Sequence, residues 1–168
     1  MIVSLIGMPG CGKSCMGRAI AKRLGLRCVD GDRIIERHTG KRLQNIIDEQ
    51  GLDEFLKIEE EVILSITDDN IMLSTGGSAV YSDKAMRYLK SRGPVVYLYC
   101  SLDVIKERLG DFSKRGVALR PGQTLESLYE ERCVLYEKYA DVTVDVSGKQ
   151  YAKYQARVIA AIQYLCDN

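Results

Sequence analysis

One short segment constrains the fold of this chain more than any other. The apolar run MIVSLI is followed at once by GMPGCGKS, which ends at Ser14. A buried strand, a glycine-rich loop with the pattern GxxxxGKS and a helix together form the context of a phosphate-binding loop. The glycines let successive backbone N–H groups face a phosphate, and the N-terminus of the following helix adds partial positive charge there. The segment predicts a nucleoside triphosphate site, with Lys13 at the β- and γ-phosphates and a magnesium ion at the Ser14 hydroxyl. A glycine-rich turn without a ligand is the alternative.

The rest of the chain alternates short β-branched runs with longer amphipathic segments. Strands are predicted over residues 2–6, 26–30, 70–75, 95–100 and 142–146. Helices are predicted over residues 13–24, 32–38, 43–50, 53–67, 82–93, 102–109 and 125–140 and from about 150 onward, with Ser82 as an N-cap and Gly93 as a stop signal. Because strands separated by helices indicate parallel βαβ units, we expect a three-layer α/β/α sandwich with a five-stranded parallel sheet. The absence of linkers and repeats predicts a single domain over residues 1–168.

The composition limits the classes of partner. The 24 Lys and Arg residues nearly balance the 23 Asp and Glu residues, and the net charge of +1 predicts no binding to nucleic acid or to an anionic membrane. No apolar run approaches the roughly 20 residues of a membrane span, and the first residues do not have the pattern of a signal peptide. The six cysteines are scattered without a CxxC pair, which is typical of reduced thiols in a cytoplasm. We therefore expect a cytoplasmic monomer with a small-molecule partner.

The second predicted strand ends in an acidic turn, VDGDRII, which contains Asp30 and Asp32. Ligands of parallel α/β sheets bind at the carboxyl ends of the strands, and alternation along a strand predicts both side chains on one side. One carboxylate can orient magnesium-bound water while the other accepts a hydrogen bond from an acceptor hydroxyl, which suits phosphoryl transfer. A helix N-cap beside a solvated aspartate is the alternative. Since the chain has no guanine-reading NKxD segment and is small for a motor or helicase, the pattern favours a small P-loop kinase.

Five segments together resemble the shikimate kinase family in their order and spacing: GMPGCGKS, VDGDRIIERHTG, DEFLKIEEEVIL, LSTGGSAV and EERCVLYEKYAD. The resemblance runs from Met1 to about Val146. It is specific because the acidic turn and the STGG segment after the third strand accompany the common phosphate loop. The resemblance implies a P-loop kinase fold with a lid, ATP and Mg²⁺ as cofactors, shikimate as the acceptor and a place in aromatic amino acid biosynthesis.

The resemblance also implies a role for each matching residue on the donor side. Arg108 would pack near the adenine, and Arg115 would close on the phosphates from a lid over about residues 110–124, a role for which Arg120 competes. The implied catalytic residues are Lys13, Asp32 and Arg115. The implied donor-binding residues are Gly10, Cys11, Gly12, Lys13, Ser14, Cys15, Arg108, Arg115 and Arg120.

On the acceptor side the resemblance implies that Asp32 contacts the substrate hydroxyls and acts as a base, while Asp30 and Ser14 hold the metal. Arg132 would hold the substrate carboxylate. The implied acceptor-binding residues are Asp32, Gly76, Gly77, Ser78 and Arg132.

Three further features bear on these roles. Arg132 shares a helix face with apolar residues, so it should be paired by an anionic ligand or by an inward carboxylate such as Glu59; a structural Arg–Glu pair without ligand contact is the alternative. The run EEE at residues 59–61 is mostly a solvated helix face, and His38 is a surface side chain. Residues 110–124 are basic and rich in glycine, which suits a closing lid, although an ordinary exposed loop would look similar.

Two positions depart from the family pattern. Leu56 stands where an arginine that shares the substrate carboxylate is expected, and Ser78 replaces the third glycine of the turn. Lys57 points about 100° away around the helix and is a doubtful substitute for that arginine. Three functions remain open at this point: an ATP:shikimate phosphotransferase, a kinase of the same build for another small hydroxylated metabolite, and a nucleotide-binding protein without turnover.

Overall fold

The computed structural model describes residues 1–110 and 117–167 and contains a five-stranded sheet in the order β2-β3-β1-β4-β5. All neighbouring strands are parallel. The strands are β1 (Ile2–Ile6), β2 (Arg27–Asp30), β3 (Ile71–Ser74), β4 (Val95–Tyr99) and β5 (Val142–Asp145). The predicted parallel sheet is therefore confirmed, and each strand lies within the predicted range.

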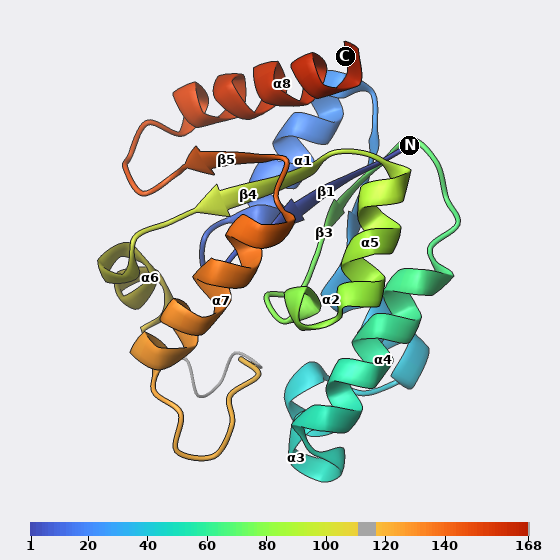
Figure 1. Ribbon diagram of the computed structural model, residues 1–168, viewed down its shortest axis with the longest axis vertical. Helices are drawn as coiled ribbons and strands as arrows, with labels where there is room; N and C mark the ends of the chain where they lie inside the picture. Colours follow the sequence, from blue (N-terminus) through green and yellow to red (C-terminus); the bar gives the residue numbers. More distant parts are fainter. Residues whose placement is uncertain (111–116, 168) are drawn as a thin grey trace.

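Helices connect the strands and cover both faces of the sheet (Figure 1). They are α1 (Lys13–Leu24), α2 (Gly31–Thr39), α3 (Leu43–Gln50), α4 (Leu52–Ser65), α5 (Asp83–Arg92), α6 (Leu102–Leu109), α7 (Leu125–Tyr139) and α8 (Tyr151–Asp167). One short 3₁₀ helix, η1 (Ala79–Tyr81), was not predicted. Ser82 caps α5 by accepting a hydrogen bond from the backbone N–H of Ala85, and Gly93 ends it, as predicted.

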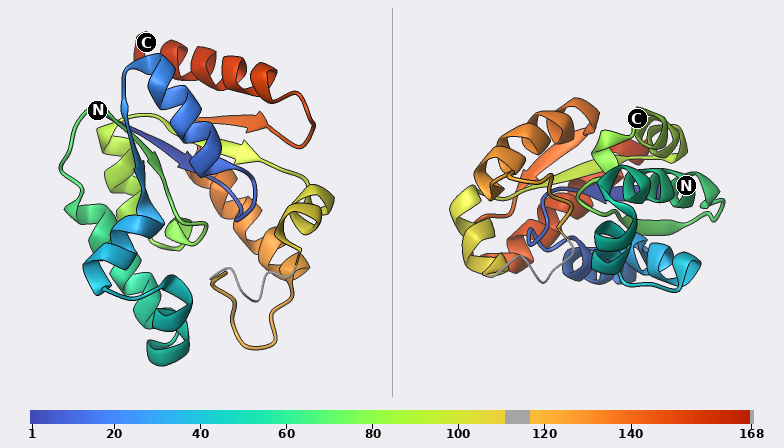
Figure 2. Two further views of the ribbon diagram at one scale, coloured as in Figure 1. Left: turned by 180° about the vertical axis from the view of Figure 1, so that it is seen from behind. Right: turned by 90° about the horizontal axis from the view of Figure 1, so that it is seen from below.

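The layers of the sandwich are clear when the molecule is viewed from opposite sides. Helices α5 and α7 pack on one face, against β1 and β4, while α1 packs on the other face against β1, β2 and β3. Helix α8 lies beside α1 on that second face and contacts β5 (Figure 2). The predicted three-layer α/β/α architecture is confirmed.

The position of β1 at the centre of the sheet decides where ligands can bind. All five of its residues are buried because both faces of a central parallel strand are covered by helices. The chain continues from β1 to one side of the sheet and from β3 to the other, so the loop after β1 lies at the point where the strand order reverses. Crevices at such points are the usual ligand sites of parallel α/β sheets.

A second, smaller apolar cluster supports the far end of the molecule. It joins α2, α3 and α4 through Ile35, Ile46, Phe55 and Val62, and it includes Ala118 from the segment before α7. The described part of the predicted lid segment, residues 117–124, is therefore not exposed throughout: Val117 and Ala118 are buried. No helix in the described ranges combines the length and apolar character that crossing a membrane requires.

Candidate active site

The glycine-rich loop after β1 wraps around the ammonium group of Lys13. Lys13 Nζ donates hydrogen bonds to the carbonyl oxygens of Gly7 at 2.7 Å and Met8 at 3.0 Å, and the residue is only 9% exposed. The conformation needs glycine at Gly7, which has φ of 146°, because a Cβ there would lie 2.7 Å from the carbonyl oxygen of Leu98. The sequence therefore builds a tight loop that holds one cation at the N-terminus of α1.

Ser14 and Asp30 meet beside this loop. The Ser14 hydroxyl donates to Asp30 Oδ2 at 2.8 Å, although the two residues come from α1 and β2. Asp30 Oδ1 accepts from the backbone N–H of Asp32 at 3.1 Å and so caps α2. The two interpretations of this aspartate, as a helix cap and as a metal-side carboxylate, are compatible because each uses a different oxygen.

Asp32 is positioned by a helix and not, as predicted, by the alternation of a strand. Helix α2 begins at Gly31, so Asp32 lies in the first helical turn and strand alternation does not place it. That part of the sequence argument was wrong, because the acidic turn is already helical. Burial raises the pKa of Asp32 to about 6, against the opposing effect of Lys13 and with support from Asp30 and Glu36.

One pocket of about 300 Å³ is lined both by the phosphate loop and by residues from the other side of the cavity. Lys13 and Ser14 line it from the phosphate loop, and Asp32 and Arg132 line it from α2 and α7. The predicted site residues that line it are Gly10, Gly12, Lys13, Ser14, Cys15, Asp32, Gly76, Gly77, Ser78 and Arg132. Residues that the sequence did not indicate also contribute, among them Pro9, Phe55 and Val117. Segments far apart in sequence thus form a single two-sided cavity.

Arg132 is a buried cation on the acceptor side of this pocket. It is 1% exposed, its Nη2 donates to the carbonyl oxygen of Ala118 at 2.8 Å, and its Nε donates to the Tyr81 hydroxyl at 3.3 Å. The guanidinium also stands over the Tyr81 ring, 5.3 Å from its centroid. In the described ranges no carboxylate lies within ion-pair distance of it. Because a buried, unpaired charge is costly, the position favours an anionic ligand group.

Glu59 is a buried carboxyl group next to the same pocket. It is 2% exposed, its Oε2 accepts a hydrogen bond from the Ser78 hydroxyl at 2.5 Å, and its Oε1 has no partner among the described residues. Burial raises its pKa to about 7, and the charge of Asp32 adds to this effect. Glu59 is thus the inward carboxyl group of the run 59–61, as one of the expectations for Arg132 required, but it forms no ion pair with Arg132 in the described ranges, and Glu61 is exposed as predicted. The spacing of Glu59 from Phe55 and Val62, on the apolar face of α4, was the signal that could have indicated its burial.

Gly76 lets two carboxyl groups approach the pocket together. A Cβ at this position would lie 2.3 Å from Glu59 Oε1 and 2.9 Å from Asp32 Oδ1. The turn after β3 is therefore held free of side chains at the point where Asp32 and Glu59 converge. Any larger residue at Gly76 would displace one of the two carboxyl groups.

A second pocket of about 240 Å³ lies on the other side of the phosphate loop. Arg108 lines it, and its Nη1 donates to the carbonyl oxygen of Cys11 at 3.3 Å. Tyr151 and Tyr154 of α8 also line this pocket and were not predicted as site residues. Arginine and aromatic side chains are the groups that pack on flat nucleobases. This pocket suits the base of a nucleotide whose phosphates lie in the loop.

Other predicted residues lie outside these pockets. Arg120 forms an ion pair with Glu131 at 3.4 Å and stands over the Tyr81 ring, 5.9 Å from its centroid. Arg115 lies outside the described residues, so which arginine acts from the lid stays a prediction. Leu56 packs against the second apolar cluster, and Lys57 is exposed and pairs with Glu54 at 3.2 Å. His38 is exposed, as predicted.

Comparison with known proteins gives a consistent result. The family model described as shikimate kinase matches residues 9–163. A shikimate kinase of Haemophilus influenzae is 38% identical over 161 residues, which cover 94% of this chain and 89% of that protein. A shikimate kinase of Francisella tularensis is 40% identical over 152 residues, 87% of this chain and 85% of the relative. The solved structure of the Acinetobacter baumannii shikimate kinase in complex with shikimate superposes with a TM-score of 0.88 at 29% identity, covering 97% of this chain and 93% of that one.

Proposed function

Because the chain belongs to the shikimate kinase family, we propose that it transfers the γ-phosphoryl group of ATP to a hydroxyl group of shikimate. The observation that carries this proposal is the pocket of about 300 Å³ that Lys13 lines from the donor side and Asp32 and Arg132 line from the acceptor side. Phosphoryl transfer depends mainly on positioning the two reactants and neutralising charge, and the pocket offers groups for both tasks.

On the acceptor side, Asp32 is the group that accepts the proton of the attacking hydroxyl. A carboxyl group with a pKa of about 6 is ionised at neutral pH and is a stronger base than an ordinary aspartate. The hydroxyl oxygen then bonds to the γ-phosphorus while the bond to the β-phosphate oxygen breaks and ADP leaves. Arg132 holds the carboxylate of the acceptor, for which its guanidinium is suited because it is buried and has no carboxylate partner among the described residues.

On the donor side, the loop N–H groups and Lys13 hold the phosphates, and Arg108 with Tyr151 and Tyr154 holds the adenine. Ser14 and Asp30 would hold Mg²⁺. Their oxygens are 2.8 Å apart, which fits an ion that takes one hydroxyl and one carboxylate from the protein and its other ligands from phosphates and water. The bound ion would neutralise charge that develops on the phosphates.

The activity test measures ADP release by the purified protein with ATP and Mg²⁺ against a panel of hydroxy acids and polyols. Shikimate-dependent release that disappears in Asp32→Asn and persists in Asp53→Asn, an exposed aspartate on α4, would support the proposal. Turnover of a different acceptor would instead identify the protein as a kinase of the same build for another small hydroxylated metabolite. The presence of Leu56 in place of an expected arginine is the reason to test this alternative. ADP release that no acceptor stimulates would overturn the assignment as a kinase.

The setting of this activity is a further part of the proposal. All six cysteines are free thiols, which supports a reducing compartment such as the cytoplasm. The groups described above come from a single chain, so a monomer would be sufficient for catalysis. Sedimentation of the purified protein with and without ATP would test whether it is a monomer.

A further inference from the structure

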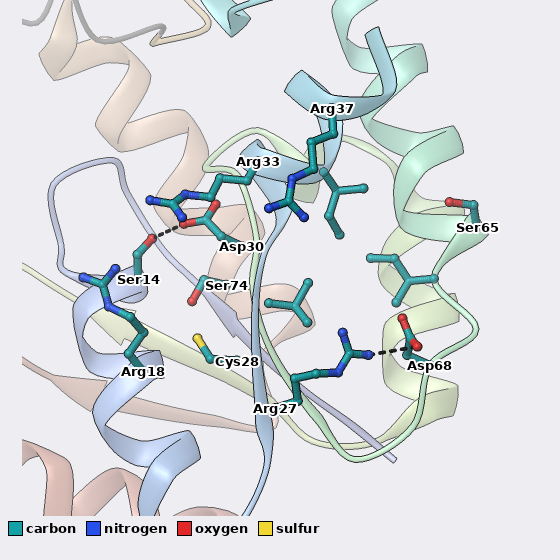
Figure 3. Close-up of a pocket in the computed structure, with 13 residues that line it drawn as sticks. Ser14, Arg18, Arg27, Cys28, Asp30, Arg33, Arg37, Ser65, Asp68 and Ser74 are labelled. Atoms are coloured by element: carbon teal, nitrogen blue, oxygen red, sulfur yellow. Dashed lines mark hydrogen bonds and ion pairs between the residues drawn. The ribbon is translucent and has the colours of Figure 1, made fainter. Parts of the chain in front are cut away.

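A cavity outside the proposed nucleotide and acceptor pockets lies on the other side of the Ser14–Asp30 pair, and these two residues form part of its wall. It has a volume of about 440 Å³ and lies between α1, β2, α2 and the end of α4 (Figure 3). Only Ser14 lines both this cavity and the pocket of about 300 Å³ in the described part of the chain. The volume is within the range of small-molecule binding sites, which is roughly 300–1,000 Å³. We call it the arginine pocket because of the four arginines that line it: Arg18, Arg27, Arg33 and Arg37.

The charges of the arginine pocket are not balanced by the protein. Arg27 pairs with Asp68 at 2.8 Å. Within residues 1–110 and 117–167, the other three arginines have no hydrogen bond or ion pair. The only other acid that lines the pocket is Asp30, which forms no ion pair among the described residues, so four arginines and two aspartates leave the lining with two positive charges in excess. Three guanidinium groups therefore face one concavity without a carboxylate partner.

All four arginines are exposed to solvent, but they line one cavity instead of an open helix face. Arg33 and Arg37 are four residues apart on α2, where like charges repel each other, and Arg18 adds a third charge from α1. Figure 3 shows Arg37 and Arg27 reaching into the same space from opposite ends, while Arg18 and Arg33 lie near Ser14 and Asp30. The wall between them is apolar and formed by Val29, Ile34 and Ile66.

We propose that the arginine pocket is a second binding site, for a small metabolite that carries at least two phosphate or carboxylate groups. Guanidinium groups bind both kinds of anion through paired hydrogen bonds, and three of them can neutralise an oligoanion at two ends. The hydroxyl groups of Ser65 and Ser74 already donate to the carbonyl oxygens of Val62 and Lys13, so the arginines are the donors for a ligand, and the apolar wall accommodates a short carbon skeleton. This site is independent of the identity of the acceptor, because it shares no acceptor-side residue with the catalytic pocket.

Titration calorimetry with two probes tests the site. Inorganic pyrophosphate represents phosphate ligands and citrate represents carboxylate ligands. Both titrations are made without divalent metal ions and with saturating ADP and shikimate, so that the phosphate loop and Arg132 are already occupied. Binding of either probe under these conditions is expected, and the stronger one identifies the class of anion. No binding of either probe would overturn the proposal.

Matched double variants locate the binding. The pair Arg33→Gln and Arg37→Gln removes two charges from the arginine pocket, and the pair Lys22→Gln and Arg23→Gln removes two exposed charges from the last turn of α1, outside the lining of the pocket. We expect at least roughly tenfold weaker binding in the first pair and little change in the second, since charge-assisted hydrogen bonds are lost only in the first. Equal weakening in both pairs, or none in the first, would show that the probe binds elsewhere or by net charge alone. Thermal unfolding of each variant verifies that it is folded.

Discussion

The donor half and the acceptor half of the proposed active site are built in different ways. The phosphate-binding part of the donor half is one continuous segment from Gly7 to Ser14, whose function depends mainly on its backbone conformation. The acceptor half combines single side chains from α2, the turn after β3 and α7, with a buried carboxyl from α4 behind them. The first half depends on local geometry, while the second depends on packing and on charges held away from water. Substitutions in the donor half and in the acceptor half should therefore affect the protein in different ways.

The largest effect is expected in the donor half. Lys13→Ala should lower kcat/KM for ATP by roughly a thousandfold, because the ammonium group that faces the transferred phosphates is lost from a water-poor site. The measurement is ADP release at saturating shikimate. Lys22→Ala, an exposed lysine two turns along the same helix, is the control and should behave as the wild type. Near-wild-type rates in Lys13→Ala would disprove the phosphate-loop assignment.

The second effect concerns stability and belongs to the acceptor half. Burial raises the pKa of Glu59 from 4.5 to about 7, so the folded state binds this proton more tightly than the unfolded state. Its stabilising contribution is full below pH 4.5 and is lost as the pH rises through about 7. Glu59→Gln keeps the shape and removes the charge. Relative to wild type, its free energy of unfolding should therefore rise by up to about 3 kcal/mol between pH 4.5 and pH 8.

Chemical denaturation at the two pH values measures this difference. Glu61→Gln is the control, because Glu61 is exposed on the same helix and should show no such dependence. If the stability difference between Glu59→Gln and wild type were equal at both pH values, Glu59 would not be a protonated buried carboxyl.

The two halves were also unequally predictable from the sequence. The donor loop, its lysine and its serine could be located because their spacing is local and the backbone geometry follows from the glycines. Asp32 was found for the wrong reason, since the turn after β2 is already helical. The run at residues 59–61 was assigned mostly to a solvated face, although Glu59 was named as a possible inward partner of Arg132; its contact with Ser78 was not predicted, because it depends on how the turn after β3 packs on α4. Tyr151 and Tyr154 were not predicted as site residues, since nothing local indicates that α8 returns to the phosphate loop.

Arg132 provides a third test, of the acceptor half alone. Arg132→Met should raise KM for shikimate about 10- to 150-fold, which corresponds to the loss of one charged hydrogen bond of roughly 1.5–3 kcal/mol. KM for ATP should change little, because the residue contacts no donor group. Arg87→Met removes an exposed arginine that pairs with Asp83 and serves as the control. An equal rise of KM for both substrates would mean that the variant distorts the pocket rather than removing a carboxylate contact.

The smallest effect separates Lys57 from Arg132 as the cation for the acceptor. Lys57 follows the position where the family arginine is expected, but it is exposed and pairs with Glu54 at 3.2 Å. Because exposed ion pairs contribute about 1 kcal/mol or less, Lys57→Ala should leave KM for shikimate unchanged and lower the free energy of unfolding by no more than that amount. A rise in KM comparable to that of Arg132→Met would show that Lys57 swings into the pocket when the acceptor binds. In that case the acceptor half would have two cations, and Lys57 would compensate for the arginine that Leu56 replaces.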